Sequence, residues 1–497
     1  MKVVIASSEA VPFSKTGGLA DVASALSKAL AQSGHDVTLI VPYYSSLQTG
    51  AKGSPEIVPT GTSVDADVGP KRSTANVLRS QLSGSNVTVL LIDCPEYFGR
   101  NGLYQEDGVD YDDNCARFVF FSRAVMESIR VLKLSPDVIH ANDWQTGLIP
   151  VLLDAEYRNR DDLAETASVF TIHNMAFQGQ FWHWDMLLTG LDWDYFNWQQ
   201  MEFFNHLNLL KSGVVFAEMV TTVSPTYAKE IQTEEFGFGL HDVLSAKADS
   251  LVGVLNGVDT EIWNPEKDPA LVENYSADSV FAGKAACKTN LQKTVGLPVR
   301  DDAPLFGIIS RMTDQKGFDL LEHSVGDILN SEAQLCVLGS GEAHWEHFFE
   351  NLAQMHPQQV AATIGFDDKL AHQIEAGADI FLMPSRFEPC GLNQMYSLLY
   401  GTVPIVRSVG GLADSVVNAT EDNLANGTAT GFQFSDYTHL ALSEQIHRAL
   451  EIYRDAPKWQ QIMSTGMRQD WSWSRSAQTY ARVYERAIKN VRLATCQ

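Results

Sequence analysis

Basic side chains and glycines follow two apolar stretches of this chain, in patterns suited to binding a phosphate group. Lys15 precedes the glycine pair of residues 17–18, where backbone amides can approach a ligand closely and a helix start favours an anion. Arg311 and Lys316 follow a later apolar run and can converge across one loop. A tight turn with a solvated lysine and a pair of surface charges remain the alternatives. The segment with Lys15 and the glycine pair matches neither a Walker loop nor a dinucleotide-binding fingerprint.

A carboxylate and a histidine follow other apolar runs. Glu388 lies between an apolar run and a helical pattern, where a carboxylate can hold sugar hydroxyls or stabilise positive charge. His173 ends the segment 170–174 and could donate a hydrogen bond to a sugar or a leaving group. Residues 140–144, which include Asp143, form a similar polar cluster. The structural alternatives are a helix-capping role for Glu388, a small buried residue for Cys390 and a structural histidine.

Two further features suggest ligands less strongly. Asp192 and Asp194 resemble an Asp-x-Asp metal motif, but they lie in an aromatic segment and we favour packing over metal binding. The aromatics of residues 181–198 could stack on sugar faces, although a local core is the commoner explanation. Residues 339–342 form either a third backbone cradle or a tight strand-to-helix turn.

The elements that must position these residues alternate between short apolar runs and helical patterns. Helices are predicted at 16–32, 114–131, 392–400 and 474–491. Strands are predicted at 2–6, 37–41, 87–92, 138–140, 168–172, 219–223, 305–309, 335–338, 361–364, 380–383 and 403–406. Such alternation indicates parallel sheets with helices on both faces, and ligands then bind beyond the carboxyl ends of the strands.

The alternation restarts after Pro265, so we predict an α/β chain with two Rossmann-like, doubly wound domains that face a deep cleft. The predicted domains are residues 1–258 and 259–473, followed by a C-terminal helix over 474–497. The periodicity alone lets that last helix pack on either domain.

Composition limits the classes of partner. The chain has 497 residues and a formal net charge of −25, which disfavours nucleic acid and anionic membrane surfaces. No apolar run suits a signal peptide or a membrane span, so we expect a soluble, cytoplasmic protein. Six scattered cysteines suggest neither a zinc site nor a disulfide framework: Cys94, Cys115, Cys287, Cys336, Cys390 and Cys496.

Taken together and in order, these motifs resemble the bacterial glycogen synthase and plant starch synthase family. The similarity runs from Lys2 to about Tyr484 and rests on the segments 15–21, 170–174, 253–265, 310–317, 384–391 and 410–414. It implies the GT-B arrangement of two Rossmann-like domains. It also implies transfer of glucose from ADP-glucose to the non-reducing end of glycogen or a malto-oligosaccharide, with retention at the anomeric carbon. It implies no cofactor and no metal.

The resemblance also implies roles for individual residues. The catalytic set would be Glu388, His173, Lys316 and Arg311. In this set, Arg311 and Lys316 meet the diphosphate, His173 contacts the transferring glucose, and Glu388 holds that glucose or stabilises its transition state. The substrate-binding set would be Lys15, Gly18, Asp21, Asp143, Asn174, Phe366, Cys390, Gly391 and Leu392. Lys15 also meets the diphosphate, and Gly18, Gly391 and Leu392 lend it backbone amides.

The sequence departs from the family pattern at two positions. Gln145 follows Asp-Trp where some members have histidine, and Phe366 stands where some have a tyrosine near the adenine, so the base preference is open. UDP-glucose as donor, and an inactive glucan-binding homologue, are therefore the alternative functions. A phosphorolytic enzyme lacks a lysine context for pyridoxal phosphate, and a dehydrogenase lacks its glycine fingerprint. The chain offers no convincing nucleophile, which favours same-face attack.

Overall fold

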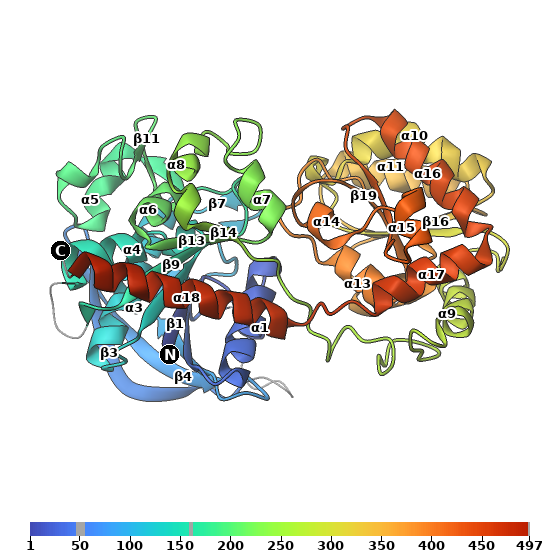
Figure 1. The fold of residues 1–497 in the computed structure, drawn as a ribbon. Helices are drawn as coiled ribbons and strands as arrows, with labels where there is room; N and C mark the ends of the chain where they lie inside the picture. The colour runs from blue at the N-terminus through green and yellow to red at the C-terminus, as the bar shows by residue number, and fades with distance from the viewer. Residues whose placement is uncertain (46–54, 159–162, 496–497) are drawn as a thin grey trace. The chain divides into compact units, whose positions relative to one another are not determined.

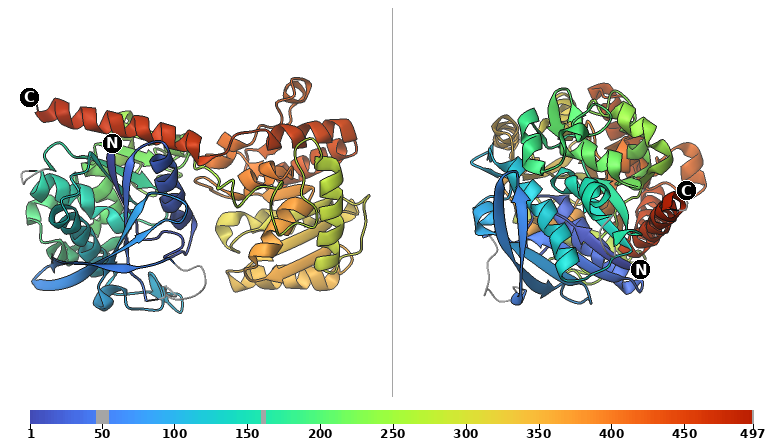
Figure 2. Two further views of the ribbon diagram at one scale, coloured as in Figure 1. Left: turned by 90° about the horizontal axis from the view of Figure 1, so that it is seen from below. Right: turned by 90° about the vertical axis from the view of Figure 1, so that its left-hand side faces the viewer.

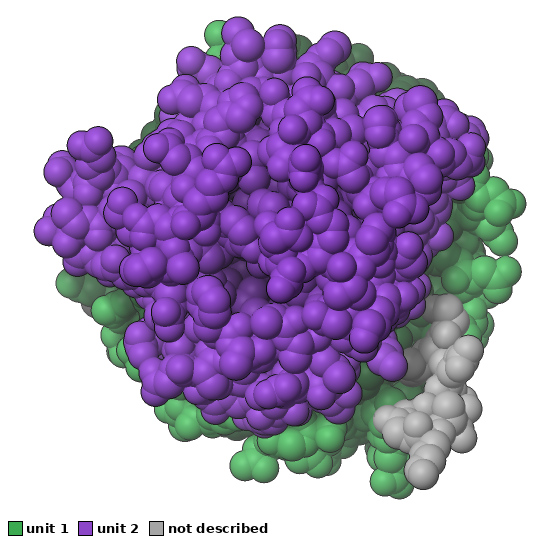
Figure 3. Space-filling view, turned by 90° about the vertical axis from the view of Figure 1, so that its right-hand side faces the viewer, with its two compact units in different colours: residues 1–257, 473–497 green, residues 258–472 purple. Residues whose placement is uncertain are grey.

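The computed structural model describes residues 1–45, 55–158 and 163–495. It divides into two compact units (Figure 1), which Figure 3 colours separately. Unit 1 comprises Met1–Gly257 and Trp473–Gln497, and unit 2 comprises Val258–Ser472. Each unit is built on its own sheet, so the predicted α/β class with two Rossmann-like domains is confirmed. Five cysteines are free and buried, and Cys496 lies outside the described residues.

The main sheet of unit 1 has the strand order β14-β13-β9-β8-β1-β2-β5-β4-β3 within the described residues. Neighbours from β14 to β5 run parallel, as the alternating pattern predicts. The strands are β1 (Lys2–Ala6), β2 (Asp36–Pro42), β3 (Val58–Val68), β4 (Lys71–Gln81), β5 (Thr88–Asp93), β8 (Val138–Asn142), β9 (Ala167–Ile172), β13 (Met219–Thr222) and β14 (Leu251–Gly253). Short strands outside this sheet are β6 (Gln105–Glu106), β7 (Val109–Asp110), β10 (Gln180–Trp182), β11 (Glu202–Phe203) and β12 (His206–Asn208).

An antiparallel hairpin extends one edge of this sheet, and the sequence analysis missed it. β3 pairs with β4, and β4 pairs antiparallel with β5 (Figure 2). Along β3 the buried residues Val64, Ala66 and Val68 alternate with more exposed neighbours, which is typical of a strand with one solvated face. The signal in the sequence is this alternation, followed by Gly69 with φ 57° at the turn. The unit 1 sheet is therefore mixed and not purely parallel.

Helices cover both faces of the unit 1 sheet. Those described are α1 (Gly18–Gln32), α2 (Pro95–Phe98), α3 (Asn114–Val131), α4 (Leu148–Leu152), α5 (Met186–Thr189), α6 (Leu209–Phe216), α7 (Pro225–Glu230), α8 (His241–Ala246) and α18 (Trp473–Thr495). The last helix, α18, lies beside α1 in Figures 1 and 2. It buries Tyr480, Val483 and Tyr484 in the same core as Val3 and Ile5 of β1. The end of the chain thus packs on the sheet of unit 1.

Unit 2 has an all-parallel sheet over the described residues, with the order β17-β16-β15-β18-β19-β20. Its strands are β15 (Leu305–Ile309), β16 (Gln334–Gly339), β17 (Val360–Ile364), β18 (Ile380–Met383), β19 (Val403–Arg407) and β20 (Phe432–Phe434). Its helices are α9 (Val280–Thr294), α10 (Phe318–Asn330), α11 (Ala343–Met355), α12 (Asp368–Gly377), α13 (Asn393–Leu399), α14 (Gly410–Ser415), α15 (Glu421–Ala425), α16 (His439–Tyr453) and α17 (Ala456–Met467). Among the described helices of the whole chain, none combines the length and apolar character needed to span a membrane.

Candidate functional site

An ion pair lies beyond the carboxyl ends of two adjacent strands of unit 2. Lys316 follows β15, Glu388 follows β18, and Lys316 Nζ lies 2.7 Å from Glu388 Oε2. The hydroxyl of Ser385 donates to the same oxygen at 3.1 Å. Glu388 is buried and Lys316 is largely buried, so removing either partner would leave an uncompensated charge. Two residues 72 positions apart are joined because parallel strands end at the same edge.

A pocket of about 190 Å³ opens at this ion pair. It is smaller than the roughly 300–1,000 Å³ of sites that enclose a whole small molecule, so it suits one part of a larger ligand. It is lined by Ile308, Ile309, Ser310, Arg311, Lys316, Phe318, Leu382, Met383, Pro384, Ser385, Glu388, Gly391, Leu392 and Asn393. Five predicted site residues therefore meet here: Arg311, Lys316, Glu388, Gly391 and Leu392.

The loops that carry the ion pair are joined by close backbone contacts. Arg386 N donates to Gln315 O at 2.8 Å, and the Gln315 side-chain amide donates to Phe387 O at 3.1 Å. Gly317 has φ 73°, and a Cβ atom there would lie 2.0 Å from Pro384 O. Only glycine fits this position, because a side chain would separate the two loops. The glycine after Lys316 thus serves loop packing.

Gly339 and Gly341 have the same role in loop packing. Added Cβ atoms would lie 2.0 Å from Ser310 O and 2.4 Å from Met312 O respectively. Met312 N donates to Ser340 O at 2.8 Å, which pairs the two loops. Of the two interpretations left open by the sequence, the structure favours the tight turn, with the glycines admitting the backbone of the loop that carries Arg311.

The segment 410–414 packs against the backbone of the loop that carries Glu388. A Cβ atom on Gly410 would lie 2.0 Å from Glu388 O, and one on Gly411 would lie 2.0 Å from Cys390 O. Gly411 N donates to Glu388 O at 3.1 Å. The buried side chain of Gln394 donates to Cys390 O at 3.0 Å. This backbone network holds the loop of Glu388 without using its carboxylate.

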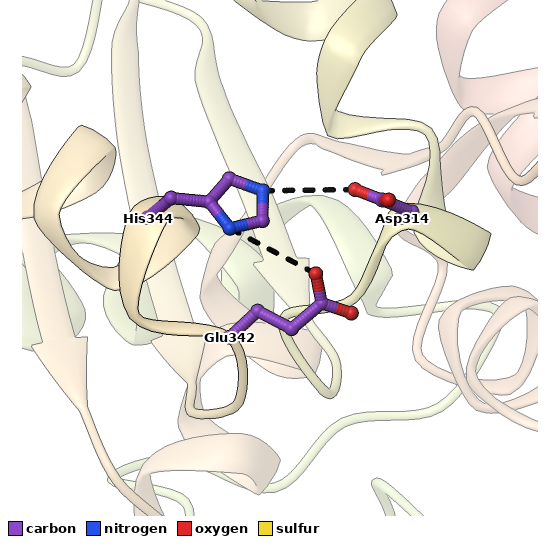
Figure 4. Close-up of side chains that lie close together, drawn as sticks. All are labelled: Asp314, Glu342 and His344. Atoms are coloured by element: carbon purple, nitrogen blue, oxygen red, sulfur yellow. Dashed lines mark ion pairs between the residues drawn. The ribbon is translucent and has the colours of Figure 1, made fainter.

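The turn before Lys316 is held by a neighbouring helix. The indole N–H of Trp345, in α11, donates to Asp314 Oδ1 at 2.9 Å, and its ring packs on Phe318. Figure 4 shows His344 between Asp314 and Glu342. Its Nε2 lies 3.6 Å from Asp314, and its Nδ1 lies 3.8 Å from Glu342. One ligand atom of each of Asp314, Glu342 and His344 lies within 4.8 Å of the other two, a spacing that could hold a metal ion and that exposed acidic groups also commonly show without one.

Two residues predicted for this site lie elsewhere in unit 2. Phe366 follows β17, is 89% exposed and does not line the pocket. Cys390 is buried behind the pocket, where Gly411 packs on it, in agreement with its structural alternative. Arg311 does line the pocket, and its side chain is exposed. The ion pair is thus the buried part of the site and Arg311 its solvent-facing part.

In unit 1, Glu9 organises the glycine loop, and the sequence analysis did not select it. Its carboxylate is buried and accepts from Thr16 N at 2.5 Å, Thr16 Oγ1 at 2.6 Å and Gly17 N at 3.4 Å. Tyr104 OH also donates to it at 2.6 Å. The backbone amides of Thr16 and Gly17 therefore donate to Glu9. The sequence analysis expected amides of this loop to face an anionic ligand. The available signal was its position three residues beyond the end of strand β1.

Lys15, Gly18 and Asp21 form the exposed side of this loop. Lys15 Nζ lies 2.9 Å from the Asp21 carboxylate, and both side chains are exposed. Such a pair contributes little stability, so Lys15 can exchange Asp21 for another anion at small cost. Gly18 begins α1 beyond the amides that Glu9 accepts from. The loop places these residues together, as the motif indicates.

Asp143 and His173 meet where β8 and β9 end. Asp143 Oδ1 accepts from His173 N at 2.7 Å, and His173 Nε2 lies 2.9 Å from Asn142 Oδ1. Asn142 is oriented by the donation of its Nδ2 to Ala6 O at 3.1 Å, so Nε2 of His173 carries the proton. Nδ1 is then an acceptor. Donation by His173 to a ligand stays a prediction; in this tautomer Nδ1 is the nitrogen left to accept a hydrogen bond.

Asp143 is strained and electrostatically perturbed. Its φ of 56° and ψ of 179° belong to a region that almost only glycine occupies, and such strain gathers at functional sites. Desolvation raises the pKa of Asp143 to about 7, opposed by the N–H groups of His173 and Asn174 and reinforced by Glu9. Desolvation also lowers the pKa of His173 to about 3, so its imidazole is neutral.

His140, in the same cluster of the sequence, is a core residue. Its Nδ1 lies 2.8 Å from Tyr484 OH of α18, and its Nε2 lies 2.5 Å from Thr171 Oγ1. Burial lowers the pKa of His140 to about 3. The structural interpretation therefore applies to His140, which links Tyr484 of α18 to Thr171 of β9.

The aromatic segment corrects another expectation. Phe181 packs on Trp144 with ring centroids 5.6 Å apart, but Trp182, Trp184 and Trp193 are 61%, 49% and 40% exposed. These three indoles are not a local core. Asp192 accepts from Asp194 N at 2.9 Å, which is a capping contact.

The sequence matches two family models and several proteins of known name. Residues 2–246 match the family model described as the starch synthase catalytic domain, and residues 292–463 match glycosyl transferases group 1. A glycogen synthase of Anaeromyxobacter dehalogenans is 46% identical over 485 residues, covering 97% of this chain and 99% of that protein. A glycogen synthase of Rhodopirellula baltica is 44% identical, with 98% of each chain covered.

Solved structures agree with this match. The catalytic domain of starch synthase IV from Arabidopsis thaliana, bound to ADP and acarbose, has a TM-score of 0.89 and 34% identity, covering 98% of this chain and 99% of that one. A sucrose-phosphate synthase from Thermosynechococcus elongatus, with a TM-score of 0.58 and 16% identity, shares the fold alone.

Proposed function

Because the chain belongs to the family of glycogen and starch synthases, which are glycosyltransferases, we propose that it uses ADP-glucose as donor. It transfers glucose to the non-reducing end of an α-1,4-glucan and retains the anomeric configuration. The observation that carries the proposal is the unit 2 pocket, in which Arg311, Lys316 and Glu388 meet. A relative of similar fold bound to ADP and acarbose supports a nucleotide donor and a saccharide acceptor.

The pocket suits the leaving group of such a transfer. Breaking the bond between glucose and diphosphate places negative charge on the diphosphate and positive charge on the sugar. In a chain of net charge −25, a lysine and an arginine at one strand edge supply the local positive charge that a diphosphate needs. A volume of about 190 Å³ holds part of the donor, consistent with a diphosphate site.

Glu388 sets the direction of the Lys316 ammonium. The ion pair and the Ser385 hydroxyl hold both side chains at the pocket wall before any donor arrives. When phosphate oxygens approach Lys316, the Glu388 carboxylate stays paired with Lys316, and its negative charge still favours the positive charge that develops on the sugar. Lys316 thus matches the negative charge on the diphosphate, and Glu388 matches the positive charge on the sugar. Both side chains are already in place, so they need to move little in the transition state.

The residues of the pocket bear on how a retaining transfer would proceed. Among the described residues that line it, Glu388 supplies the carboxylate, and that carboxylate is bound to Lys316. An ion-paired carboxylate is a weak nucleophile, so a covalent glucosyl intermediate on Glu388 is disfavoured. We therefore propose attack by the acceptor hydroxyl on the face that the phosphate leaves, with the departing phosphate receiving the hydroxyl proton.

We assign the unit 1 cluster to sugar hydroxyls. His173 is neutral and presents Nδ1 as an acceptor, and Asp143 offers a second acceptor with a pKa of about 7. Asn174 follows in the same loop and adds an amide. The contacts of Lys15 and Gly18 with the diphosphate, of Asp21 with donor or acceptor, and of Phe366 with adenine stay predictions, as does a cytoplasmic location.

Nucleotide release is the measurement that tests the proposal. The purified chain is incubated with ADP-glucose or UDP-glucose, each with and without glycogen, while labelled glucose in the polymer is counted. We expect ADP release that depends on glycogen and equals the glucose incorporated. A preference for UDP-glucose would replace the donor and keep the mechanism. No nucleotide release from either donor, in a folded chain that still binds glycogen, would favour the inactive glucan-binding alternative.

The stereochemistry needs a separate readout. Product chains made from labelled donor are digested with an enzyme specific for α-1,4 bonds, and the release of label is followed. Complete release is expected for a retaining transfer from an α-linked donor. Label that resists digestion would overturn retention and leave the donor assignment intact.

A further inference from the structure

Three nearly parallel rings join the first residues of unit 2 to a helix at the pocket. The indole of Trp263 lies between the imidazole of His372, in α12, and the phenol of Tyr396, in α13, with ring centroids 3.9 Å and 3.8 Å away. The ring planes differ by 5° and 6°, so each face of the indole is in van der Waals contact with a neighbouring ring. The stack thus gives a structural partner to a motif, residues 253–265, on which the family resemblance rests.

A buried carboxylate ties the same part of the chain to both helices. Asp268 lies five residues after Trp263, and its Oδ2 is 2.6 Å from Nδ1 of His372. The same oxygen accepts a hydrogen bond from the hydroxyl of Tyr400, which directly follows α13. Asp268 and His372 are buried, so their contact is shielded from water and correspondingly stronger. The segment 263–268 is therefore attached to α12 and to both the middle and the end of α13.

The helix held by the stack carries part of the pocket wall. Gly391, Leu392 and Asn393 line the pocket, and Asn393 is the first residue of α13. Tyr396 N donates to Leu392 O at 3.0 Å, so the stacked residue lies about one helical turn from the wall and is bonded to it. The side-chain amide of Asn393 donates to Ile309 O, at the end of β15, at 2.5 Å. A displacement of Tyr396 therefore moves backbone that lines the pocket.

The other end of the stack leads to the place where the chain enters unit 2. Trp263 N donates to Asp259 O at 2.9 Å, which closes a short turn directly after Val258. Val258 N donates to Trp471 O at 2.7 Å, and Val258 pairs in parallel with Ser472, the last residue of unit 2. The first and last residues of unit 2 are thus joined beside the turn that ends at Trp263. Trp263 connects this junction, through α13, to the pocket wall.

We propose that Trp263 is a positioning residue for the nucleotide donor. Held between His372 and Tyr396, it fixes α13 so that the backbone of residues 391–393 keeps the shape that a diphosphate requires. It is not among the residues that line the pocket, and it acts through Tyr396 and the hydrogen bond from Tyr396 to Leu392. The contact uses the faces of the indole, so another flat ring can replace it in part and an aliphatic side chain cannot. This inference rests on the proposed function for the identity of the ligand.

Hydrogen–deuterium exchange without any ligand tests the positioning directly. The exchange of backbone amides in residues 391–400 is compared between the parent chain, Trp263→Leu and Trp263→Phe. We expect these amides to exchange at least tenfold faster in Trp263→Leu, because α13 opens locally more often once the stack is lost. Trp263→Phe keeps a flat ring between the two partners and should stay within about threefold of the parent. If Trp263→Leu does not fold, Tyr396→Leu removes the same stack from the side of α13 and takes its place.

Trp459→Leu is the matched control for a general loss of stability. Trp459 is a buried tryptophan of unit 2, but its ring neighbours are Phe432 in β20 and Tyr453 in α16. Its loss should destabilise unit 2 without a selective rise of exchange in residues 391–400. Unchanged exchange there in Trp263→Leu, or an equal rise in Trp459→Leu, would overturn the proposal.

Nucleotide affinity tests whether the position of α13 matters for the donor. ADP binding is measured by calorimetry, and steady-state kinetics give KM for ADP-glucose and for maltotriose. We expect Trp263→Leu to weaken ADP binding and to raise KM for ADP-glucose about tenfold each, with KM for maltotriose unchanged and both donor values largely restored in Trp263→Phe. Equal rises in both KM values, or parental ADP affinity in Trp263→Leu, would overturn the proposal. A parent chain that binds neither ADP nor UDP would instead overturn the proposed function, and the exchange measurement would still decide whether Trp263 holds the pocket wall.

Discussion

Lys316 Nζ and Glu388 Oε2 lie 2.7 Å apart at the wall of the unit 2 pocket, although 72 residues separate them in the chain. Their side chains are 17% and 9% exposed, so each charge depends on the other for its burial. Both face the space where we place a diphosphate and the sugar attached to it. The same contact that stabilises the loops is thus part of the proposed chemistry.

Substitution at this pair should abolish most of the transfer. We expect Lys316→Ala to lower kcat/KM by at least 100-fold, because the charge on the leaving diphosphate loses its partner. Glu388→Gln keeps hydrogen bonds to Lys316 and Ser385 but removes the negative charge, and should lower kcat by a similar factor. Nucleotide release measures both. Lys458→Ala is the control, since Lys458 pairs with Asp455 on an exposed surface of unit 2. Near-parental rates in the first two variants would refute the assigned roles.

Trp345 should act as a positioning residue for the turn of Lys316. Trp345→Phe removes the indole N–H that donates to Asp314 and keeps a ring against Phe318. Loss of one such hydrogen bond costs about 1–2 kcal/mol of stability. We expect KM for the donor to rise several-fold while KM for maltotriose is unchanged. Trp459→Phe is the matched control, because Trp459 is buried among Phe432 and Tyr453. An equal change in both variants would indicate a merely structural role.

The Asp143 carboxyl should make stability depend on pH. Its pKa is about 7 when folded and about 4 when unfolded, so between these values folding takes up a proton. The contribution of Asp143 to stability is therefore full below pH 4 and falls as pH rises through 7. Asp143→Asn keeps the acceptor for His173 N and has no proton to lose.

Thermal unfolding of Asp143→Asn and the parent at pH 4.5 and pH 8 tests this dependence. We expect the unfolding free energy of the variant, relative to that of the parent, to rise by on the order of 2–4 kcal/mol from pH 4.5 to pH 8. A parallel pH dependence of the two chains would contradict the raised pKa.

Replacing Gly339 by a larger residue should displace the loop that carries Arg311. A Cβ atom at Gly339 would lie 2.0 Å from Ser310 O, so Gly339→Ala forces the two loops apart. We expect a loss of about 1–3 kcal/mol in unfolding free energy and a rise in KM for the donor. Gly326→Ala, in the middle of α10, is the matched control. Its added methyl meets open space, so it should leave activity unchanged and stabilise the helix by up to about 1 kcal/mol.

Much of the fold follows from local pattern. The strands β1, β15 and β18 and the helix α3 have the bounds that their periodicity predicts, because burial of one face imposes a repeat that can be recognised along the chain. The placing of Lys316 and Glu388 at strand ends follows equally, since parallel strands bring their carboxyl ends to one edge. The β3–β4 hairpin was not predicted, because two successive antiparallel strands depart from the alternation of strands with helices that marks the rest of the sheet.

Only the tertiary structure decides what the remaining residues do. Gly339 and Gly341 lie in a segment that the sequence alone left open as a ligand cradle, yet loop packing requires them, and this depends on atoms distant in the chain. The proton on Nε2 of His173 is fixed by Asn142, and the exposure of Trp182 by the side of β10 on which it lies. Residue type and spacing are local and can be recognised in the sequence, whereas hydrogen-bond partners, burial and the pKa values they set arise when distant segments meet.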